Sequence, residues 1–551
     1  MVKYGMSNAA DKSSILPPAY TLPDVTLPDV LPTDVAALTA LLLEQQKAHQ
    51  AVKLQALGHI QYLYEQFILL RHRQFGVSSE QMAAQPSLFD EAETLAQDST
   101  ADQDVAPLPP EQPDSTTPVQ PIPEKARGKR LPLPPELERV DVVHDVPESE
   151  RICPCGTAMV EIGRDISEQL DIIPMQVRVL RHIRIRYGCL QSLHTPVTAA
   201  LPPQPLPKSN ASSDFLAMLL TVKFVDGLPL ARFESVLARH GTPVPRQTLA
   251  RWVIGASQLL QPLHNLMRDT LMDGPFIHMD ETVVQVLKVP DKAPTSASYM
   301  WVQVGGPPGK PVVLYDFDPS RGGAVPVRLL AGYRGYLMTD GYKGYNELVR
   351  TEEIEHLVCW AHARRNFVEA ARVQAKGKRG RADEAIELIG KLYKIERDHK
   401  NASDAERLQA RQQHSLPVLK KLQTWLEKTL VAVPPKSALG NAAAYLRDYW
   451  SRLIRYTERG DLPIDNNRAE ASIRPFVVGR KAWLFSDTLA GAHSSAIIYS
   501  LVETAKANGL EPYTWLRRVM RALPAAKTVE DIEALLPWNL HSQDLASELT
   551  P

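Results

Sequence analysis

The segment Phe276-Ile277-His278-Met279-Asp280-Glu281-Thr282 decides the expected fold, because it carries two acids inside an apolar run that continues to residue 287. An apolar run of this kind predicts a strand. Residues 299–304 and 312–317 are expected to be two further strands, and the turn signal Gly-Gly-Pro-Pro at residues 305–308 separates them. The region therefore opens with three consecutive strands.

The elements that follow alternate between helix and strand. A short helix is expected at residues 324–330, a fourth strand at 335–339 and a fifth strand at 356–361. The order strand-strand-strand-helix-strand-helix-strand is that of a ribonuclease H-like core, so we expect an α+β fold. The first and fourth strands of such a core are neighbours. They would bring Asp280 together with Asp340, the residue after the fourth strand.

A third acid is expected from a helix that packs on this sheet. The stretch Asp465-Asn466-Asn467-Arg468-Ala469-Glu470 begins such a helix, and its first residue, Asp465, is placed as the N-cap. Glu470 and Arg474 are four residues apart, so they share one face of the helix.

Three clustered carboxylates are a site for divalent cations. Two Mg²⁺ (or Mn²⁺) ions about 3.5–4 Å apart can activate the attacking oxygen and stabilise the leaving oxygen when a phosphodiester is displaced in line. These ions take oxygen ligands, and the acids repel one another in their absence. A single aspartate at a strand end is usually a turn or cap residue. The strand order and the later helical acid together favour a metal site at Asp280, Asp340 and Glu470.

The bulk composition bounds the class of protein. A chain of 551 residues is expected to have several domains, and its 44% hydrophobic and 23% charged residues are ordinary for a globular protein. We expect no secretory signal and no membrane span, because neither a basic and apolar leader nor a run of about 18 apolar residues occurs. Four cysteines in so long a chain do not form a disulfide framework, which predicts a reducing cytoplasm.

Charge is strongly segregated along the chain, although the formal net charge is only −1. Residues 80–124 contain ten acids and no lysine or arginine, whereas residues 360–381 contain seven basic residues and one acid. A local basic patch can bind a phosphate backbone with release of counterions, or it can be a solvated face. Both interpretations stay open for the second stretch.

The amino-terminal part divides into a tail, a helix and a linker. We expect a Pro-rich disordered tail at residues 1–34, a long helix within 35–80, and an acidic, Pro-rich linker at 81–135. Apolar residues recur in the helix at spacings of three and four, at Leu57, Ile60, Tyr64 and Phe67. This stripe predicts either a coiled-coil dimer or packing against the rest of the chain.

Two segments before the sheet are candidates for DNA binding. Within a small β-rich module at residues 136–200, residues 177–187 alternate between apolar and basic side chains, which predicts a strand that buries one face. Residues 201–272 are expected to be helical, with a break at Gly241 that fits either a helix-turn-helix or ordinary core helices. The basic candidates in these segments are Arg178, Arg184, Arg186 and Arg251.

Four motifs lie in the region that carries the candidate acids: H-M-D-E-T at residues 278–282, Y-L-M-T-D-G-Y at 336–342, C-W-A-H-A-R-R-N-F at 359–367 and I-D-N-N-R-A-E-A-S-I-R-P at 464–475. They resemble motifs of the IS66 family of insertion-sequence transposases. The stretches R-K-A-W-L-F-S from Arg480 and T-A-K-A-N-G-L from Thr504 fit the carboxyl-terminal part of that family. The resemblance covers nearly the whole chain outside the tails and the acidic linker.

The resemblance implies that Asp280, Asp340 and Glu470 form a DDE triad. It implies a catalytic domain at residues 273–490 with a helical insertion at about 370–460, and a carboxyl-terminal helical domain at 491–551. Trp360 and His362 would lie either beside the active site or in the packed core. The residues expected to hold DNA around the site are Arg364, Arg365, Lys378, Arg379, Arg474, Arg480 and Lys481.

Similar proteins carry a cysteine-rich zinc module before the catalytic core. Structural zinc needs four ligands, commonly in two close pairs. Here Cys153 and Cys155 form the first pair, and Ser192 stands where the partner of Cys189 is expected, so His194 would be the fourth ligand. The module is therefore either a Zn²⁺ site or a remnant held by its own small core.

We therefore predict an α+β multidomain protein whose ribonuclease H-like catalytic core, with its helical insertion, follows an N-terminal helix, a linker and a small zinc-finger-like module. It would be a DDE transposase that cuts the ends of its element and transfers them to target DNA. Expected partners are the terminal inverted repeats, target DNA, accessory transposition proteins and further copies of the chain, at the nucleoid and with no membrane. The alternatives are a nuclease of the same fold without strand transfer and an inactive DNA-binding regulator.

Overall fold

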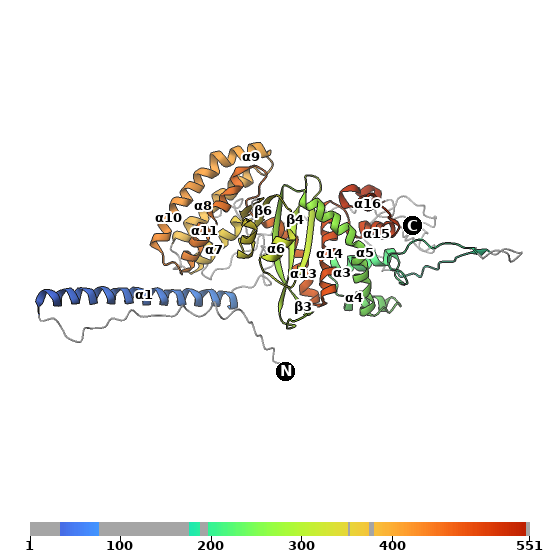
Figure 1. Cartoon of the computed structure of the whole chain (residues 1–551), viewed down its shortest axis with the longest axis horizontal. Coiled ribbons are helices and arrows are strands. Elements are labelled where there is room, and N and C mark those ends of the chain that lie inside the picture. The colour runs from blue at the N-terminus through green and yellow to red at the C-terminus, as the bar shows by residue number, and fades with distance from the viewer. Residues whose placement is uncertain (1–33, 76–175, 188–196, 351–352, 374–378, 547–551) are drawn as a thin grey trace, which may run out of the picture. The chain divides into compact units, whose positions relative to one another are not determined.

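The computed structural model describes residues 34–75, 176–187, 197–350, 353–373 and 379–546 (Figure 1). Internal contacts divide the chain into two compact units. The first comprises Met1–Asp102, Arg184–Ala238 and Pro243–Pro551, and the second Gln103–Ile183 with Arg239–Thr242. The sheet and the helices described below belong to the first unit.

A mixed sheet is central to this unit, with the strand order β5-β4-β3-β6-β7. The strands are β3 (Phe276–Lys288), β4 (Ala297–Gly305), β5 (Val312–Asp318), β6 (Gly335–Thr339) and β7 (Ile354–Val358). Strands β3, β4 and β5 pair antiparallel, whereas β3, β6 and β7 pair parallel. A short strand, β8 (Ser486–Thr488), pairs with the last part of β3.

The five strands expected from the sequence are present, and the first and fourth of them, β3 and β6, are neighbours as predicted. Their register pairs His278 with Met338. Parallel strands run toward the same edge of a sheet, so Asp280 and Asp340 lie at one edge. The prediction of a fifth strand reaching residue 361 is wrong at its end, since β7 stops at Val358.

The chain changes from strand to helix after β7 because the side chain of Trp360 is buried in a core formed by helices. Helix α7 (Trp360–Arg372) buries Trp360, Ala363 and Phe367 at helical spacing. The indole of Trp360 donates to Leu453 O (2.8 Å), and its backbone N–H donates to Ile464 O (3.2 Å). An apolar run this short does not distinguish strand from helix by itself.

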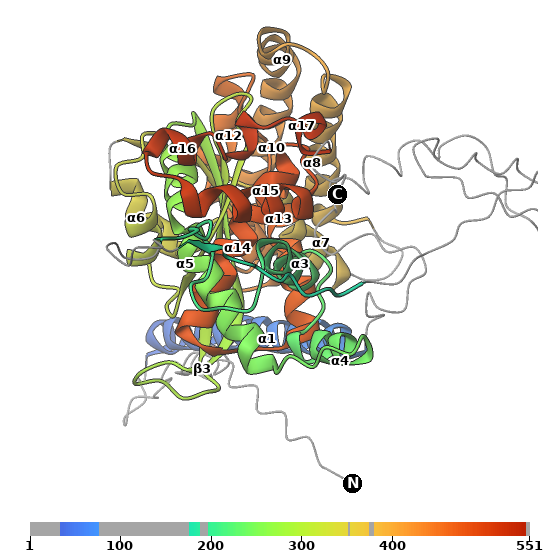
Figure 2. The same ribbon diagram turned by 90° about the vertical axis from the view of Figure 1, so that its right-hand side faces the viewer.

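Hydroxyl groups of helix α14 (Leu489–Ala507) form hydrogen bonds with the backbone of the edge strand β5. The backbone N–H of Tyr315 donates to Ser500 Oγ (2.7 Å), and that of Val313 donates to Thr504 Oγ1 (3.0 Å). An uncovered edge would leave these backbone groups free to pair with another chain. Helix α14 also packs against α5 (Arg246–Met272) and α3 (Ser213–Phe224) (Figure 2).

The residues between β7 and the last acid form a bundle of helices. That this bundle is an insertion into the catalytic domain stays a prediction. After α7 come α8 (Arg381–Asp398), α9 (Asp404–Ala410), α10 (Leu416–Ala432), α11 (Ala438–Asp448) and α12 (Trp450–Ile454) (Figure 1). The bundle contains a buried ion pair between Arg411 Nη2 and Glu396 Oε2 (2.6 Å). Arg411 also donates to the carbonyl oxygens of Tyr456 (2.7 Å) and Leu462 (2.9 Å). Its guanidinium group therefore finds its hydrogen-bond partners inside the bundle.

The helical predictions upstream of the sheet agree with the structure. Helix α1 (Val35–Phe75) is continuous, and three stripe residues, Ile60, Tyr64 and Phe67, are more than half exposed. Helices α4 (Leu230–Arg239) and α5 flank Gly241, whose φ of +76° suits a residue without Cβ. Dimerisation by α1 and DNA reading by α5 stay predictions.

The strand expected at residues 177–187 is wrong for most of its length. Only β1 (Arg186–Tyr187) is a strand there, and it pairs with β2 (Val197–Thr198). Val179 and Ile183, on the face expected to be buried, are 89% and 77% exposed. Alternation gives a segment two faces, but a face is buried only where another layer covers it, and the described residues place none there.

Helices outside the bundle and the sheet include α15 (Pro512–Ala522) and α16 (Val529–Glu533), in the region expected to be helical. Among the described helices, none is both long and apolar enough to span a membrane. The expected linker at residues 81–135 lies outside the described residues.

The buried ion pair of the bundle yields a stability prediction. Arg411→Ala would leave the Glu396 carboxylate inside the bundle without its cation, which costs about 3–5 kcal/mol. The matched control is Arg447→Ala, since Arg447 is 58% exposed and pairs with its sequence neighbour Asp448; less than about 1 kcal/mol is expected. Hydrogen exchange of the α8 and α10 amides measures both, and equal effects of the two variants would contradict the buried role of Arg411.

Candidate active site

Four carboxylates lie together where β6 ends beside β3. Asp280 and Glu281 lie on β3, Asp340 follows β6, and Glu470 lies in the first turn of α13 (Asn467–Trp483). Burial raises the pKa of Asp280 well above its usual range, and the negative charges of Glu281, Asp340 and Glu470 raise it further. The structure therefore brings the three acids predicted from the sequence into one electrostatic cluster.

Glu281 differs from Asp280 because it has a cationic partner. Arg321 Nη2 lies 2.6 Å from Glu281 Oε1, and the Tyr345 hydroxyl donates to Glu281 Oε2 (2.5 Å). The guanidinium of Arg321 lies over the Tyr342 ring, 3.9 Å from its centre. Burial still raises the pKa of Glu281, and the Tyr345 hydroxyl and Arg321 offset part of that shift. Glu281 therefore has partners of its own, and Asp280 is the acid of β3 that remains a candidate metal ligand.

The Asp340 loop is held by tyrosines of the helical bundle. Asp340 Oδ1 accepts from Tyr342 N (2.7 Å), while the hydroxyl of Tyr445 on α11 donates to Asp340 O (2.7 Å). The Tyr449 hydroxyl donates to Gly341 O (2.7 Å). Gly341 has a φ of +87°, and a Cβ there would lie 2.7 Å from the Tyr445 hydroxyl oxygen. The helical bundle thus positions the loop that carries the second acid.

Asn466 fixes the start of α13 to β3. Its Nδ2 donates to Met279 O (2.9 Å), so its Oδ1 faces His278 and accepts from Nδ1 of that ring (3.1 Å). Burial, followed by the charge of Arg468, lowers the pKa of His278 to about 4, so the ring is neutral at pH 7. Because Glu470 follows within one turn, this clamp sets its distance from β3.

The structure corrects the expected N-cap. Asn466, not Asp465, precedes the helix, and its side chain binds β3 instead of capping α13. Asp465 still accepts from the backbone N–H of Asn467 (3.2 Å). Asn466 does not cap the helix with its side chain because its amide oxygen already accepts from His278.

His362 of α7 lies against Glu470. Its Nδ1 is 3.5 Å from Glu470 Oε1, and Arg365 Nη1 approaches its Nε2 (3.4 Å). An arginine donates only, so Nε2 accepts and Nδ1 carries the proton that faces Glu470. Burial, followed by the charge of Arg365, lowers the pKa of His362 to about 4, so the ring is neutral. Of the two places expected for His362, the structure favours the one beside the acids.

The donor set is suited to hard cations. Among the described residues, the one trio of His, Cys or acid ligand atoms within 4.8 Å of one another is Cys359, His362 and Glu470. Cys359 is an unsuitable ligand, because burial raises the pKa of its thiol and Sγ accepts from Asn466 N (3.2 Å). The oxygens of Asp280, Asp340 and Glu470 do not form such a trio. All-carboxylate ligands fit Mg²⁺ or Mn²⁺.

The basic candidates fall into three groups. Arg364 and Arg365 lie on α7 and Arg474, Arg480 and Lys481 on α13, so both helices that reach the acids carry cations. Others are solvent-facing: Arg251 on α5, Arg379 in an ion pair with Glu387, and the exposed Arg178, Arg184 and Arg186. Lys378 and the four candidate zinc ligands, Cys153, Cys155, Cys189 and His194, lie outside the described residues.

Reasoning from sequence missed the residues that position the acids. Asn466 stands inside a recognised motif but has no feature that distinguishes it from Asn467. Tyr445 and Tyr449 lie a hundred residues from the Asp340 loop in a segment with no catalytic pattern. Their spacing of four residues predicts one helix face, but it does not predict what that face contacts.

Comparison with protein families places the chain among the transposases. The model of the Transposase IS66 family matches residues 208–494, more than half of the chain. Smaller matches are the zinc-finger binding domain of transposase IS66 at residues 150–191, Transposase C of IS166 homeodomain at 62–142 and the IS66 C-terminal element at 500–538. The chain belongs to the IS66 transposase family, as its motifs predicted.

Relatives from Sinorhizobium fredii match most of the chain. Uncharacterized protein y4jD is 32% identical over 419 residues, which cover 74% of this chain and 81% of the relative. Uncharacterized protein y4qI is 31% identical over 430 residues, covering 76% and 78%, and y4hP is 29% identical over 432 residues, covering 75% and 77%. The similarity therefore extends over most of the chain and is not confined to one domain.

The Asn466 clamp can be tested by its removal. Asn466→Ala leaves Met279 O and the His278 N–H without their partner in the core, and a loss of about 1–3 kcal/mol in the free energy of unfolding is expected. Asn441→Ala, on the exposed face of α11, is the matched control and should change stability by less than about 0.5 kcal/mol. Denaturant unfolding measures both, and an unchanged Asn466→Ala variant would contradict the clamp.

The acid cluster predicts a pH-dependent stability. Burial and neighbouring charges raise the pKa values of Asp280 and Glu281, so the folded protein retains protons that the unfolded chain releases. Stability of the metal-free protein should therefore fall as pH rises above the ordinary carboxyl pKa of about 4.

The measurement is the melting temperature in EDTA at about pH 5 and pH 7, for wild type and Asp280→Asn. The fall should be smaller in the variant, and Mg²⁺ should raise the melting temperature at pH 7 in wild type alone. An identical pH profile in both proteins would mean that the acids do not interact as described.

Proposed function

We propose that this chain is a DDE transposase with a ribonuclease H-like core, in which Asp280, Asp340 and Glu470 hold two Mg²⁺ or Mn²⁺ ions. The observation that carries the proposal is the convergence of two acids on neighbouring parallel strands with a third on a helix clamped to the same strand. Membership of the IS66 family supports a transposase role. The catalytic domain proposed spans residues 273–490, with the bundle as its insertion.

The surrounding residues hold the acids in the positions where they would bind metal ions. Asn466 and His362 hold Glu470, Tyr445 holds the Asp340 loop, and Arg321 compensates Glu281. Ions bound there would supply charge to activate the attacking oxygen and to stabilise the leaving oxygen. Burial and the nearby charges of Glu281, Asp340 and Glu470 raise the pKa of Asp280, as expected where acids are gathered to bind a cation.

The reaction proposed exchanges one phosphodiester for another. Water attacks the phosphorus at each element end, the P–O3′ bond breaks, and a 3′-hydroxyl is released. That hydroxyl then attacks a target phosphodiester at the same site, so each bond formed replaces a bond broken and no nucleotide cofactor is needed. The residues proposed to hold the DNA strands at the site are Arg364, Arg365, Arg474, Arg480 and Lys481.

The proposal extends to the parts before the core. The zinc-finger match at residues 150–191 contains Cys153, Cys155 and Cys189. Together with His194, which lies just beyond the match, these residues would hold Zn²⁺ in a module that binds DNA. The exposed stripe of α1 would join two copies into a synaptic assembly with the terminal repeats, target DNA and accessory proteins. The protein would act in the cytoplasm, at the nucleoid.

Two rival functions differ in outcome. A nuclease of the same fold would cut element ends without joining them, and a strand-transfer assay with pre-cut ends separates the two. An inactive DNA-binding regulator would bind the ends without cutting. The presence of all three acids in one cluster ranks the regulator last.

The test is Mg²⁺-dependent 3′-end cleavage of a duplex that carries the element's terminal repeat. Glu470→Gln should lower the cleavage rate at least about 1,000-fold, since a lost metal ligand removes several kcal/mol of transition-state stabilisation. DNA binding by Glu470→Gln should persist. Glu533→Gln, an exposed residue of α16, is the control and should cut like wild type. Equal cleavage by Glu470→Gln and wild type would remove α13 from the active site.

A further inference from the structure

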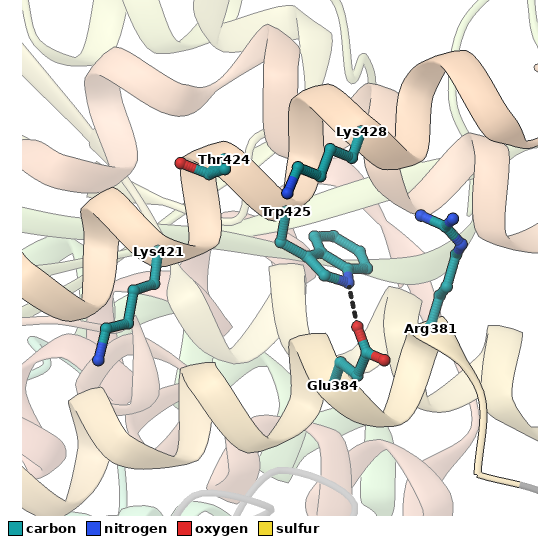
Figure 3. A pocket seen from close by; sticks show the side chains of 6 residues that line it. All are labelled: Arg381, Glu384, Lys421, Thr424, Trp425 and Lys428. Atoms are coloured by element: carbon teal, nitrogen blue, oxygen red, sulfur yellow. Dashed lines mark hydrogen bonds between the residues drawn. The ribbon is translucent and has the colours of Figure 1, made fainter.

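A second candidate site lies in the helical bundle, between α8 and α10 (Figure 3). It is a surface cavity of about 410 Å³. The side chains that line it are Arg381, Glu384, Lys421, Thr424, Trp425 and Lys428. None of them belongs to the acid cluster, and Arg381 alone falls in the basic stretch at residues 360–381.

The floor of the cavity is rigid. Trp425 is only 9% exposed, packs edge-on against Phe367 with ring centres 5.5 Å apart, and donates its indole N–H to Glu384 Oε2 (3.0 Å). Lys421, Thr424 and Lys428 stand at spacings of three and four on one face of α10. The packed indole of Trp425 therefore forms the floor, and exposed cations stand around it.

The cavity carries surplus positive charge. It has three cations and one acid, and the carboxylate of that acid already accepts from Trp425. Arg381 donates to Thr429 Oγ1 (3.2 Å), and neither Lys421 nor Lys428 forms an ion pair with any residue that the structure describes. Uncompensated like charges held on a fixed surface attract anions.

The distribution of the charges indicates the kind of anion. Figure 3 shows Lys421 and Arg381 at opposite ends of the cavity, with Lys428 above Trp425. Seven residues of helix separate Lys421 from Lys428 by about 10 Å along α10. Such a row suits a series of phosphates better than one phosphate ion, because each strand of a duplex presents one phosphate for about every 3.4 Å of helix axis.

We propose that the cavity between α8 and α10 binds the phosphodiester backbone of duplex DNA without reading its sequence. The proposal rests on the transposase function proposed above. Trp425 is covered by its own neighbours and offers no free face on which a base could stack, which favours backbone contacts over base contacts. DNA bound here would rest on the same bundle whose Tyr445 and Tyr449 hold the Asp340 loop.

The test compares two double variants of the full-length protein. Lys421→Gln/Lys428→Gln removes two cavity cations. Lys420→Gln/Lys436→Gln removes the same charge from exposed positions on and just after α10 that do not line the cavity. Fluorescence anisotropy measures binding of a terminal-repeat duplex and of an unrelated duplex of equal length over a series of salt concentrations.

The cavity variant should lower the slope of log K against log salt by about 2, because each phosphate contact contributes about 0.9. The reduction should be equal on the two duplexes, and the control variant should keep the wild-type slope. An unchanged slope, the same reduction in the control, or a reduction confined to the terminal repeat would each overturn the proposal.

Failure of this proposal is distinguishable from failure of the proposed function. Wild-type protein that binds DNA with the expected cavity contribution but does not cut it with Mg²⁺ would refute the transposase chemistry and leave the cavity site standing. Wild-type protein that cuts DNA while the cavity variant keeps its slope would refute the cavity site alone. Thermal melting of both variants, expected to match wild type, shows that the fold is intact.

Discussion

Repulsion between buried carboxylates is the constraint on which the rest of the molecule depends. Burial raises the pKa of Asp280, and the nearby charges of Glu281, Asp340 and Glu470 raise it further, so this arrangement destabilises the fold in the absence of cations. A protein keeps an arrangement of this kind where a ligand uses it. Each acid is therefore held from a different direction, by a strand ladder, by a loop fixed from another helix and by a clamped helix.

The helical bundle contacts the loop of the second acid and carries the cavity proposed to bind DNA. It lies between the second and third acids, and its tyrosines Tyr445 and Tyr449 return to the loop that carries Asp340. The same bundle contains the buried pair of Arg411 and Glu396. The cationic cavity on α8 and α10 would add a surface for DNA to the same body, so that DNA binding and the position of the second acid share one scaffold.

Much of the core could be predicted from the sequence, because its signals are local. Apolar runs between glycine-rich turns located all five strands, and their order implied the pairing of β3 with β6. Predictions that depended on tertiary context were wrong. The fifth strand, for example, ends earlier than expected because Trp360 begins helix α7 and is buried there. The strand at residues 177–187 was wrong because nothing in a sequence shows whether a second layer covers an apolar face. The Asn466 clamp could not be found, since its value lies in contacts with β3 nearly two hundred residues away.

The most direct test of the central claim counts the metal ions at the acids. Electron paramagnetic resonance of Mn²⁺ bound to the full-length protein with a terminal-repeat duplex reports whether two ions lie close together. We expect an exchange-coupled pair, with a separation of about 3.5–4 Å, that is lost in Asp340→Asn while DNA stays bound. Isolated Mn²⁺ in wild type, or a coupled pair that survives in Asp340→Asn, would contradict a two-metal site built on these acids.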